Sequence, residues 1–169
     1  LDATHHGGGK ATPAGRGVYT RTAGKMIAAL DAEGIASLGK ADEVAGAWCR
    51  LNPFDGAGVA DSNVREFRHA LVESDGMDLP KQLAIMRALH LPAVMVIHSG
   101  GKSLHAVVRV DAGTDLALYK TRVADLYDVL KRNGFEVDNQ NRNPSRLSRL
   151  PGVTRKGNLQ YIVAENIGA

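Results

Sequence analysis

The chain is poor in several kinds of residue, and each shortage excludes a class of protein. A single cysteine, Cys49, in 169 residues excludes an internal disulfide and a cysteine-rich zinc site within this sequence, and it favours a reducing, cytoplasmic setting. The longest apolar runs, such as residues 93–97, fall far short of the roughly 18 residues of a membrane span. Aromatic residues make up only 5%, without the cluster typical of RNA-recognition sheets. We therefore expect Trp48 and the phenylalanines to lie in the core.

The remaining composition describes a globular, mildly basic protein. Hydrophobic residues make up 44%, and Gly and Pro together about 15%, below the roughly 25–30% typical of disorder. The net charge is +3, but residues 131–169 carry seven basic and three acidic residues, so this end of the chain is suited to meeting phosphates. The first residues do not form a signal peptide and do not begin with Met, which leads us to expect a fragment of a longer polypeptide.

Residues 1–46 form an N-terminal loop and helical segment in our interpretation, and residues 47–169 the main domain. Residues 1–17 are rich in glycine and predict a loose lead-in, followed by a helix between an N-cap at Thr22 and Gly34 and a second, weak helical stretch.

In the main domain, apolar spacing predicts strands and helices that interleave around a central hairpin. We expect strands at 47–51, 67–74, 93–97, 104–110, 135–138 and 159–163, helices at 78–90 and 115–132, and one helical turn at 145–150. This order predicts an α+β fold with a mixed, largely antiparallel sheet flanked by helices.

Three short segments carry residues suited to chemistry, and the first is the predicted strand that ends near Glu73 and Asp75. Residues two apart on a strand point to the same face, so the two carboxylates would lie side by side. Paired carboxylates suit Mg²⁺ or Mn²⁺, which prefer oxygen ligands. The alternative is a solvated strand end without a metal.

The second segment contains Lys102, Ser103 and His105 after a glycine turn. Gly101-Lys102-Ser103 is not a nucleotide-hydrolase loop, because Val96 stands where that motif needs its first glycine and a strand follows instead of a helix. Ser103 and His105 would share one strand face, beside backbone N–H groups and a lysine that can hold a triphosphate. The alternative is a structural histidine.

The third segment places Asp138 at the end of a predicted strand, ahead of Arg146 and Arg149. On a helical turn, these two arginines would lie on one face and form a fork for phosphate oxygens. Alternatively, Asp138 caps a turn and the arginines are solvated.

The order of these segments resembles the three-motif signature of the archaeo-eukaryotic primase (AEP) superfamily, especially its phage, plasmid and mobile-element primase-polymerases. The local sequences that carry the resemblance are residues 67–75, 99–106 and 143–152, and the likeness runs from about Trp48 to Val163. The resemblance implies an AEP catalytic core, related to the RNA-recognition fold, within residues 47–169.

Residue by residue, the resemblance implies that Glu73, Asp75 and Asp138 hold two Mg²⁺ or Mn²⁺ ions. His105 would join these acids as a catalytic residue and would contact the nucleotide's phosphates with Ser103 and Lys102. Arg146 and Arg149 would contact the triphosphate or the template.

The function implied is a DNA primase or primase-polymerase that acts on a single-stranded DNA template with NTPs or dNTPs. The resemblance also implies a fused or associated helicase. It implies a cytoplasmic protein encoded by a bacterium, a phage or a plasmid. Two alternatives stay open: a catalytically weak replication initiator or single-stranded nucleic-acid-binding module, and a metal-dependent nuclease.

Overall fold

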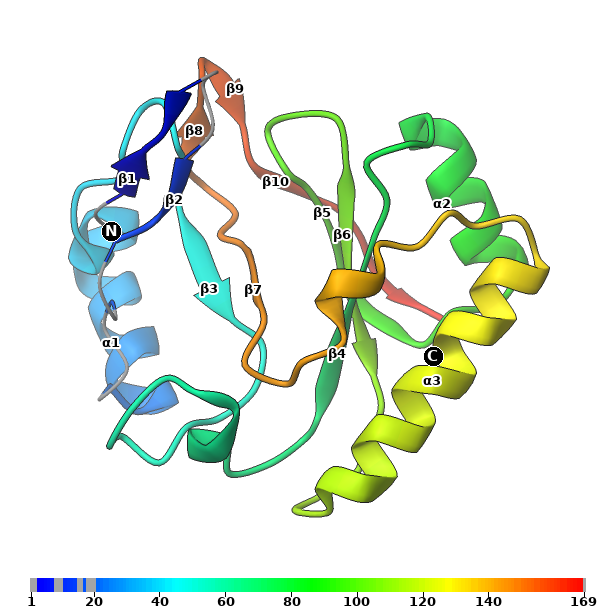
Figure 1. Ribbon diagram of the computed structural model, residues 1–169. Coiled ribbons are helices and arrows are strands. Elements are labelled where there is room, and N and C mark those ends of the chain that lie inside the picture. The colour runs from blue at the N-terminus through cyan, green and yellow to red at the C-terminus, as the bar shows by residue number, and fades with distance from the viewer. Residues whose placement is uncertain (1–2, 8–10, 15–16, 18–20, 169) are drawn as a thin grey trace.

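A four-stranded antiparallel sheet lies at the centre of the protein (Figure 1). The computed structural model describes residues 3–7, 11–14, 17 and 21–168. The strand order is β10–β5–β6–β4, with bounds Tyr161–Ile167, Ala93–His98, Leu104–Arg109 and His69–Glu73. All pairings within the sheet are antiparallel, and the register shifts once between β10 and β5 and once between β5 and β6.

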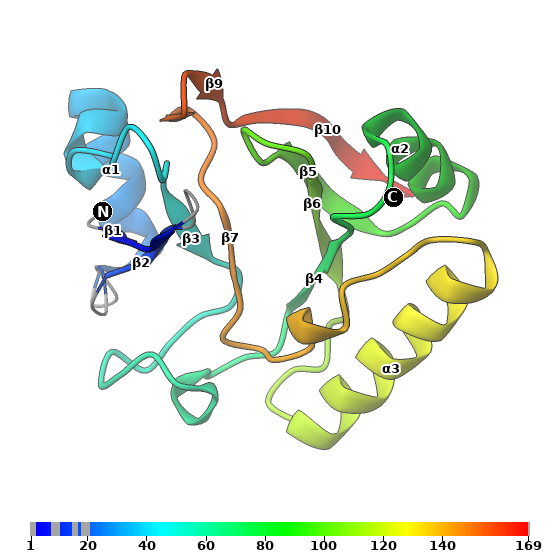
Figure 2. The same ribbon diagram turned by 45° about the horizontal axis from the view of Figure 1, so that its top comes forward.

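Two helices, α2 (Leu79–Ala88) and α3 (Leu116–Arg132), cover one face of this sheet (Figures 1 and 2). Asp115 begins α3 by accepting hydrogen bonds from the backbone N–H groups of Ala117 and Leu118. The hydrophobic core lies between sheet and helices. It contains alternate strand residues and one stripe of α3, among them Ala70, Val72, Val96, Leu104, Ala106, Val108, Met86, Tyr119, Val123, Tyr127 and Leu130.

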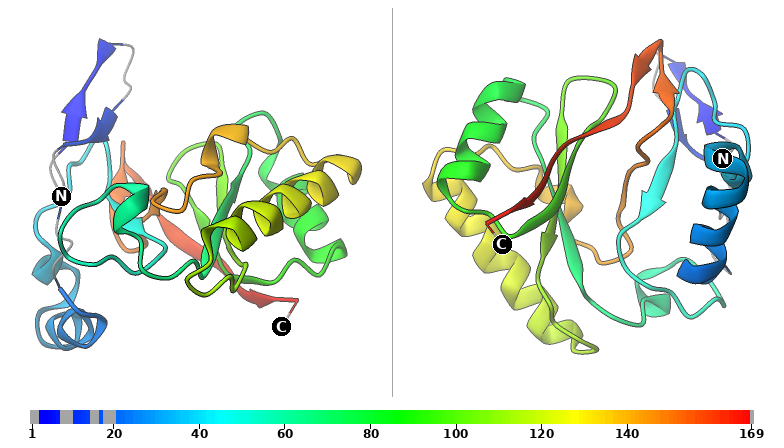
Figure 3. Two further views of the ribbon diagram at one scale, coloured as in Figure 1. Left: turned by 60° about the horizontal axis from the view of Figure 1, so that its bottom comes forward. Right: turned by 180° about the vertical axis from the view of Figure 1, so that it is seen from behind.

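The other face of the sheet looks toward a second, smaller group of elements. Its centre is a two-stranded ribbon of β3 (Trp48–Arg50) and β7 (Leu147–Arg149). Beyond the ribbon lie α1 (Ala23–Glu33) and the β1–β2 pair, on the opposite side of the molecule from α2 and α3 (Figure 3). The remaining short elements are β1 (Ala3–His5), β2 (Ala11–Pro13), β8 (Thr154–Arg155), β9 (Asn158–Leu159) and the 3₁₀ turns η2 (Gly34–Leu38), η3 (Asp61–Asn63) and η4 (Asn139–Asn141).

Buried amide side chains tie this second group to the sheet. Gln160 is fully buried and bonds the backbone N–H of Ala47 (3.3 Å) and the carbonyls of Ala47 (3.0 Å) and Leu150 (2.9 Å). Asn52 donates to the carbonyls of His69 and Pro144 and accepts from the backbone N–H groups of Arg68 and His69, where β4 begins. Because these amides satisfy buried backbone groups, they fix the ribbon relative to the sheet.

The prediction of an α+β fold with a largely antiparallel sheet is confirmed. The expected hairpin appears as β5 and β6, and the two expected helices appear as α2 and α3. Thr22 caps α1 as predicted, by accepting from the Lys25 N–H, and Gly34 ends it at a φ of 64°, which favours glycine.

Three local predictions are wrong. Residues 145–150 do not form a helical turn, because β7 pairs with β3 and takes an extended conformation. Residues 135–138 form no strand; only the Asp138 N–H donates to a strand residue, the carbonyl of Glu73 (2.9 Å). The lead-in is not loose where it is described, since β1 and β2 pair; residues 8–10 and 15–16 lie outside the described residues.

Among the helices that the structure describes, none combines the length and the apolar character needed to cross a membrane.

Candidate active site

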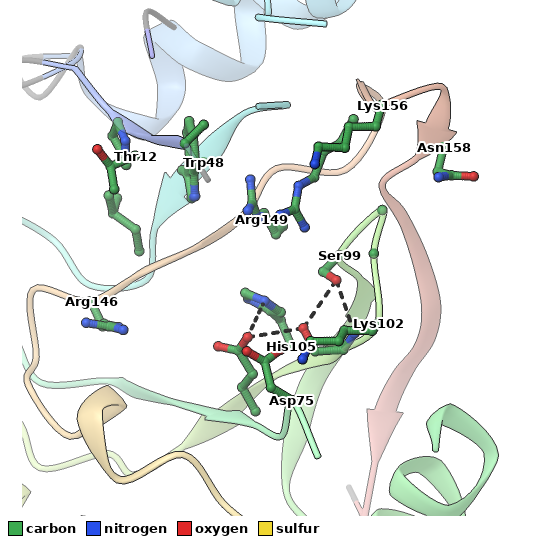
Figure 4. Close-up of a pocket in the computed structure, with 18 of the residues that line it drawn as sticks. Thr12, Trp48, Asp75, Ser99, Lys102, His105, Arg146, Arg149, Lys156 and Asn158 are labelled. Carbon is green, nitrogen blue, oxygen red and sulfur yellow. Dashed lines mark hydrogen bonds and ion pairs between the residues drawn. The ribbon is translucent and has the colours of Figure 1, made fainter. Parts of the chain in front are cut away.

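A cavity of about 920 Å³ lies between the open face of the sheet and the β3–β7 ribbon (Figure 4). Its wall combines residues from the end of β4, from the turn before β6, from the ribbon, from the β8–β9 hairpin and from β2. Its charged residues are Arg50, Glu73, Asp75, Lys102, Arg146, Arg149, Arg155 and Lys156. Four of the residues singled out in the sequence as ligands or catalytic groups, Glu73, Asp75, Ser103 and His105, meet in this cavity.

Glu73 and His105 are brought together by the register of the sheet. They are direct partners in the antiparallel pairing of β4 and β6, and their neighbours Val72 and Ala106 point into the core on the other face. His105 Nε2 lies 3.3 Å from Glu73 Oε1, and the Ser103 hydroxyl donates to the same oxygen at 3.1 Å. The prediction that Ser103 and His105 share one face therefore agrees with these contacts.

These contacts hold Glu73 in its ionised form. Burial alone raises the pKa of Glu73, but the hydrogen bond and charge of His105, with hydrogen bonds from Ser103 and Asn141, outweigh burial and bring it to about 2. A buried carboxylate with so low a pKa carries its negative charge at every physiological pH.

Asp75 lies beyond the end of β4, which stops at Glu73. The strand spacing used to predict it therefore does not extend this far, but its side chain still lines the cavity, on the same side as His105 and Lys102 (Figure 4). Asp75 is exposed and makes no hydrogen bond within the described part of the chain.

Asp138 does not appear in the cavity wall, but one amide links it to Glu73. The fully buried Asn141 donates from Nδ2 to Glu73 Oε2 (3.1 Å) and to Asp138 Oδ2 (3.2 Å), and its Oδ1 has no partner. Asp138 also caps η4 by accepting from the Gln140 N–H. Sequence reasoning missed Asn141, because an asparagine inside the polar run 139–143 resembles any loop residue.

The donor set of the cavity suits a divalent cation in chemistry. Glu73 and Asp75 supply carboxylate oxygens, which hard cations prefer. The described residues contain no group of three or more His, Cys, Asp or Glu side chains arranged to hold a metal ion. The two-metal site thus stays a prediction.

The basic side chains of the cavity outnumber its carboxylates. Within the described residues, neither Lys102, Arg146, Arg149, Arg155 nor Lys156 forms a salt bridge. Two carboxylates thus face six basic side chains, and a cavity with this excess attracts and concentrates polyanions.

The glycine turn before β6 brings two of these cations to one rim. Gly100 has a φ of 68°, and a Cβ there would lie 3.1 Å from the Arg155 Cβ and from the Asn158 carbonyl oxygen. At Gly101 a Cβ would meet Arg155 Nη1 at 2.8 Å. Glycine is favoured at Gly100, where the φ is positive and the Asn158 backbone is close, whereas a side chain at position 101 would displace only the flexible end of Arg155.

Arg146 and Arg149 do not form the predicted fork on a helix, because Arg149 lies in β7 and Arg146 precedes it. Both still line the cavity. Arg149 is 8% exposed, donates to the Ala45 carbonyl (2.7 Å) and places its guanidinium 4.6 Å from the centre of the Trp48 ring. Burial, aided by nearby Arg155, lowers the pKa of Arg149 to about 10, so it is charged at neutral pH.

Two further residues of the site were misjudged or missed from the sequence. Trp48, expected in the core, is only partly buried and lines the cavity. Ser148 lies between Arg146 and Arg149 in the sequence and is fully buried. Its Oγ lies 3.2 Å from His105 Nδ1. With Glu73 at Nε2, both ring nitrogens of His105 are thus engaged within the protein.

The chain matches no known family by sequence and no curated protein. Among solved structures, it is similar to the AEP domain of the primase-polymerase (PrimPol) of cyanophage S-2L, with a TM-score of 0.50 and 27% sequence identity. The likeness covers 66% of this chain and 59% of that domain. It supports an AEP-like fold for this chain.

Proposed function

We propose that this domain is a metal-dependent nucleotidyltransferase that synthesises or extends primers on a single-stranded DNA template. The observation that carries the proposal is the ionised Glu73, which shares one cavity with an excess of basic side chains. A cavity of this kind suits a polyanionic triphosphate held beside carboxylate ligands. The likeness to a primase-polymerase domain supports the same class of reaction.

Glu73 and Asp75 would hold Mg²⁺ or Mn²⁺, with Asp138 completing the set of ligands. When bound, such ions activate the attacking hydroxyl and offset the charge that develops on the triphosphate. Ser103, His105 and Asn141 keep Glu73 ionised and oriented, so the ligand is prepared before the ion arrives.

The basic residues would bind and orient the triphosphate. Lys102 and Arg155, which lie together at the glycine turn, and Arg149 on the ribbon can hold its phosphate oxygens. In the reaction, a 3′-hydroxyl oxygen bonds to the α-phosphorus while the bond to the pyrophosphate oxygen breaks. Cations fixed before the reaction stabilise the charge on the leaving pyrophosphate without having to reorganise.

A noncatalytic single-strand-binding module is the second candidate, and the basic wall of the cavity favours it. The same residues would serve a DNA backbone as well as a triphosphate, and binding of either kind weakens with salt. Metal-dependent incorporation of nucleotides separates the two functions.

The test is primer synthesis and primer extension on single-stranded DNA with labelled NTPs or dNTPs and Mg²⁺ or Mn²⁺. Asp75→Asn is the sharpest variant, because Asp75 is exposed and its loss breaks no internal hydrogen bond. We expect activity to fall at least about 100-fold, since even partners of metal ligands change activity by about 10–100-fold.

Asp125→Asn, at an exposed position of α3, is the matched control and should keep full activity. If the wild type incorporates no nucleotide with either metal, while it is folded and binds the template, the binding module is the correct function.

A further inference from the structure

One face of the β3–β7 ribbon forms the wall of the cavity opposite the carboxylates. Trp48 pairs with Arg149, and Arg50 pairs with Leu147. All four residues line the cavity, as expected for alternate positions on paired strands. In Figure 4, Trp48 and Arg149 lie across the cavity from Asp75 and His105.

Trp48 is the aromatic residue of this wall, in a chain that has few. The chain contains one Trp, three Phe and four Tyr, and neither Phe nor Tyr lines the described cavity. The core of the protein does not include Trp48, whereas Phe67, Tyr119, Tyr127 and Phe135 belong to it. The packing of the core therefore does not account for this indole.

The orientation of the indole is set by Arg149. The guanidinium lies 4.6 Å from the ring centre, and its bond to the Ala45 carbonyl holds it there. The ring remains partly exposed in spite of this contact. A rigid, partly open aromatic surface costs little entropy when a second flat ring stacks on it.

We propose that Trp48 stacks against the nucleobase of the nucleoside triphosphate bound in the cavity. A nucleoside triphosphate combines a flat aromatic base with a highly charged tail, and the cavity combines a partly exposed tryptophan with an excess of basic side chains. A volume of about 920 Å³ is large enough for a ligand of that size. Arg149 links the aromatic part of the cavity with its basic part, because it contacts the Trp48 ring and lies near Arg155.

This inference rests on the proposed function, and it adds how that site recognises the base. Stacking on an indole does not distinguish one base from another by hydrogen bonding. We therefore expect purine triphosphates to bind somewhat more tightly than pyrimidine triphosphates, with selection of the correct base left to the template.

The fluorescence of the native protein gives the test directly, because Trp48 is its only tryptophan. The protein is titrated with dATP, with dTTP, with inorganic tripolyphosphate and with a single-stranded oligonucleotide, while calorimetry measures binding independently. We expect the dNTPs to quench the emission to saturation and tripolyphosphate to bind without comparable quenching. Equal quenching by tripolyphosphate and dATP would overturn the proposal, and so would quenching by the oligonucleotide alone.

Two substitutions at Trp48 complete the test. Trp48→Leu should weaken dATP binding on the order of tenfold and leave tripolyphosphate binding within about twofold, whereas Trp48→Phe, which keeps a ring, should retain most of the dATP affinity. Thermal melts verify that both variants fold. Calorimetry separates the two levels of inference: no dNTP binding to the wild type contradicts the proposed function itself. Normal dNTP binding with unchanged emission contradicts only the role of Trp48.

Discussion

The two sides of the cavity differ in what holds them in place. Behind the carboxylates, the sheet packs against α2 and α3 through a continuous core of aliphatic and aromatic side chains. On the ribbon side, α1 has no buried residue, and small buried apolar residues such as Ala45, Ala47 and Val153 lie beside hydrogen-bonded Gln160, Asn52, Ser148 and Arg149. A large apolar core therefore supports the proposed metal ligands, while the wall that would receive the nucleotide depends more on directional polar bonds.

This difference matters because the two kinds of contact fail differently. Loss of apolar area from a core lowers the stability of the whole unit, whereas loss of one polar partner leaves a specific backbone group unsatisfied. Substitutions on the sheet side should thus act on global stability, and substitutions on the ribbon side on local structure and nucleotide binding.

The largest stability effect is expected for Met86→Ala in α2, which is fully buried. Removal of its side chain should lower the free energy of unfolding by about 2–5 kcal/mol, measured by urea denaturation. Ile27→Ala in α1 is the matched control on the other side, because Ile27 is 59% exposed, and it should cost less than about 0.5 kcal/mol. Equal losses in the two variants would contradict the comparison.

Next comes the acid dependence of stability, which Glu73 should dominate on the sheet side. Its pKa of about 2 lies below the ordinary value of 4.5, so its contribution is fully present above pH 4.5. That contribution is lost as the pH falls through 4.5 toward 2 and amounts to roughly 3 kcal/mol. Urea denaturation of the metal-free protein in EDTA, repeated across this range, measures it.

Glu73→Gln should flatten this acid dependence, while Glu66→Gln, at a solvent-exposed ion pair with Arg68, should leave it unchanged. An acid dependence that survives in Glu73→Gln would show that other carboxylates cause it.

On the ribbon side, Gln160→Leu removes the amide that bonds Ala47 and Leu150. The Ala47 N–H and the Leu150 carbonyl lose this partner, whereas the Ala47 carbonyl still accepts from the Leu150 N–H (3.1 Å), and the free energy of unfolding should fall by about 1–3 kcal/mol. Hydrogen exchange should rise first at β3 and β7, and nucleotide affinity should fall with it. If hydrogen exchange rises as much in β5 and β6 as in β3 and β7, the sheet and the ribbon unfold as one cooperative unit, which would contradict the comparison.

The smallest effect is expected for Ser148→Ala, which removes the hydroxyl beside His105 Nδ1. Stability should fall by about 1 kcal/mol. Because Ser148 acts through His105 and Glu73, kcat should fall more than nucleotide affinity. Ser148→Thr, which keeps the hydroxyl, should restore most of the rate. Failure of Thr to restore it would indicate a packing role alone.

The sheet side was largely predictable from the sequence. On the ribbon side, α1 and β3 were also predicted, but β7 and its pairing with β3 were not. The stripe of Tyr119, Val123, Tyr127 and Leu130 along α3 and the runs that form β5 and β6 repeat at their own structural periods. β7 gives no such signal: it has three residues, and its partner Trp48 lies about a hundred positions away. Pro144, which indicated a helix start, instead gives its carbonyl to Asn52.

The candidate site divides in the same way. Glu73, Asp75, Ser103 and His105 were found from short motifs, since carboxylates near a strand end and a serine two residues before a histidine are visible in the sequence. Asn141 and Ser148 were missed, because neither carries a charge, and each acquires its role only through a partner that folding brings to it.

The sequence by itself determined the α+β class, the two helices on the sheet, the central hairpin and the group of acids and histidine at its edge. Each of these depends on spacing within one or two segments, and such spacing acts on the chain locally. Only the tertiary structure decided that Trp48 lies in a cavity wall, that Arg149 lies over its ring, and that Asn141 joins Glu73 to Asp138. Some of those contacts join residues far apart in the chain, and others depend on the conformation of a loop. Their geometry depends on packing that no local pattern encodes.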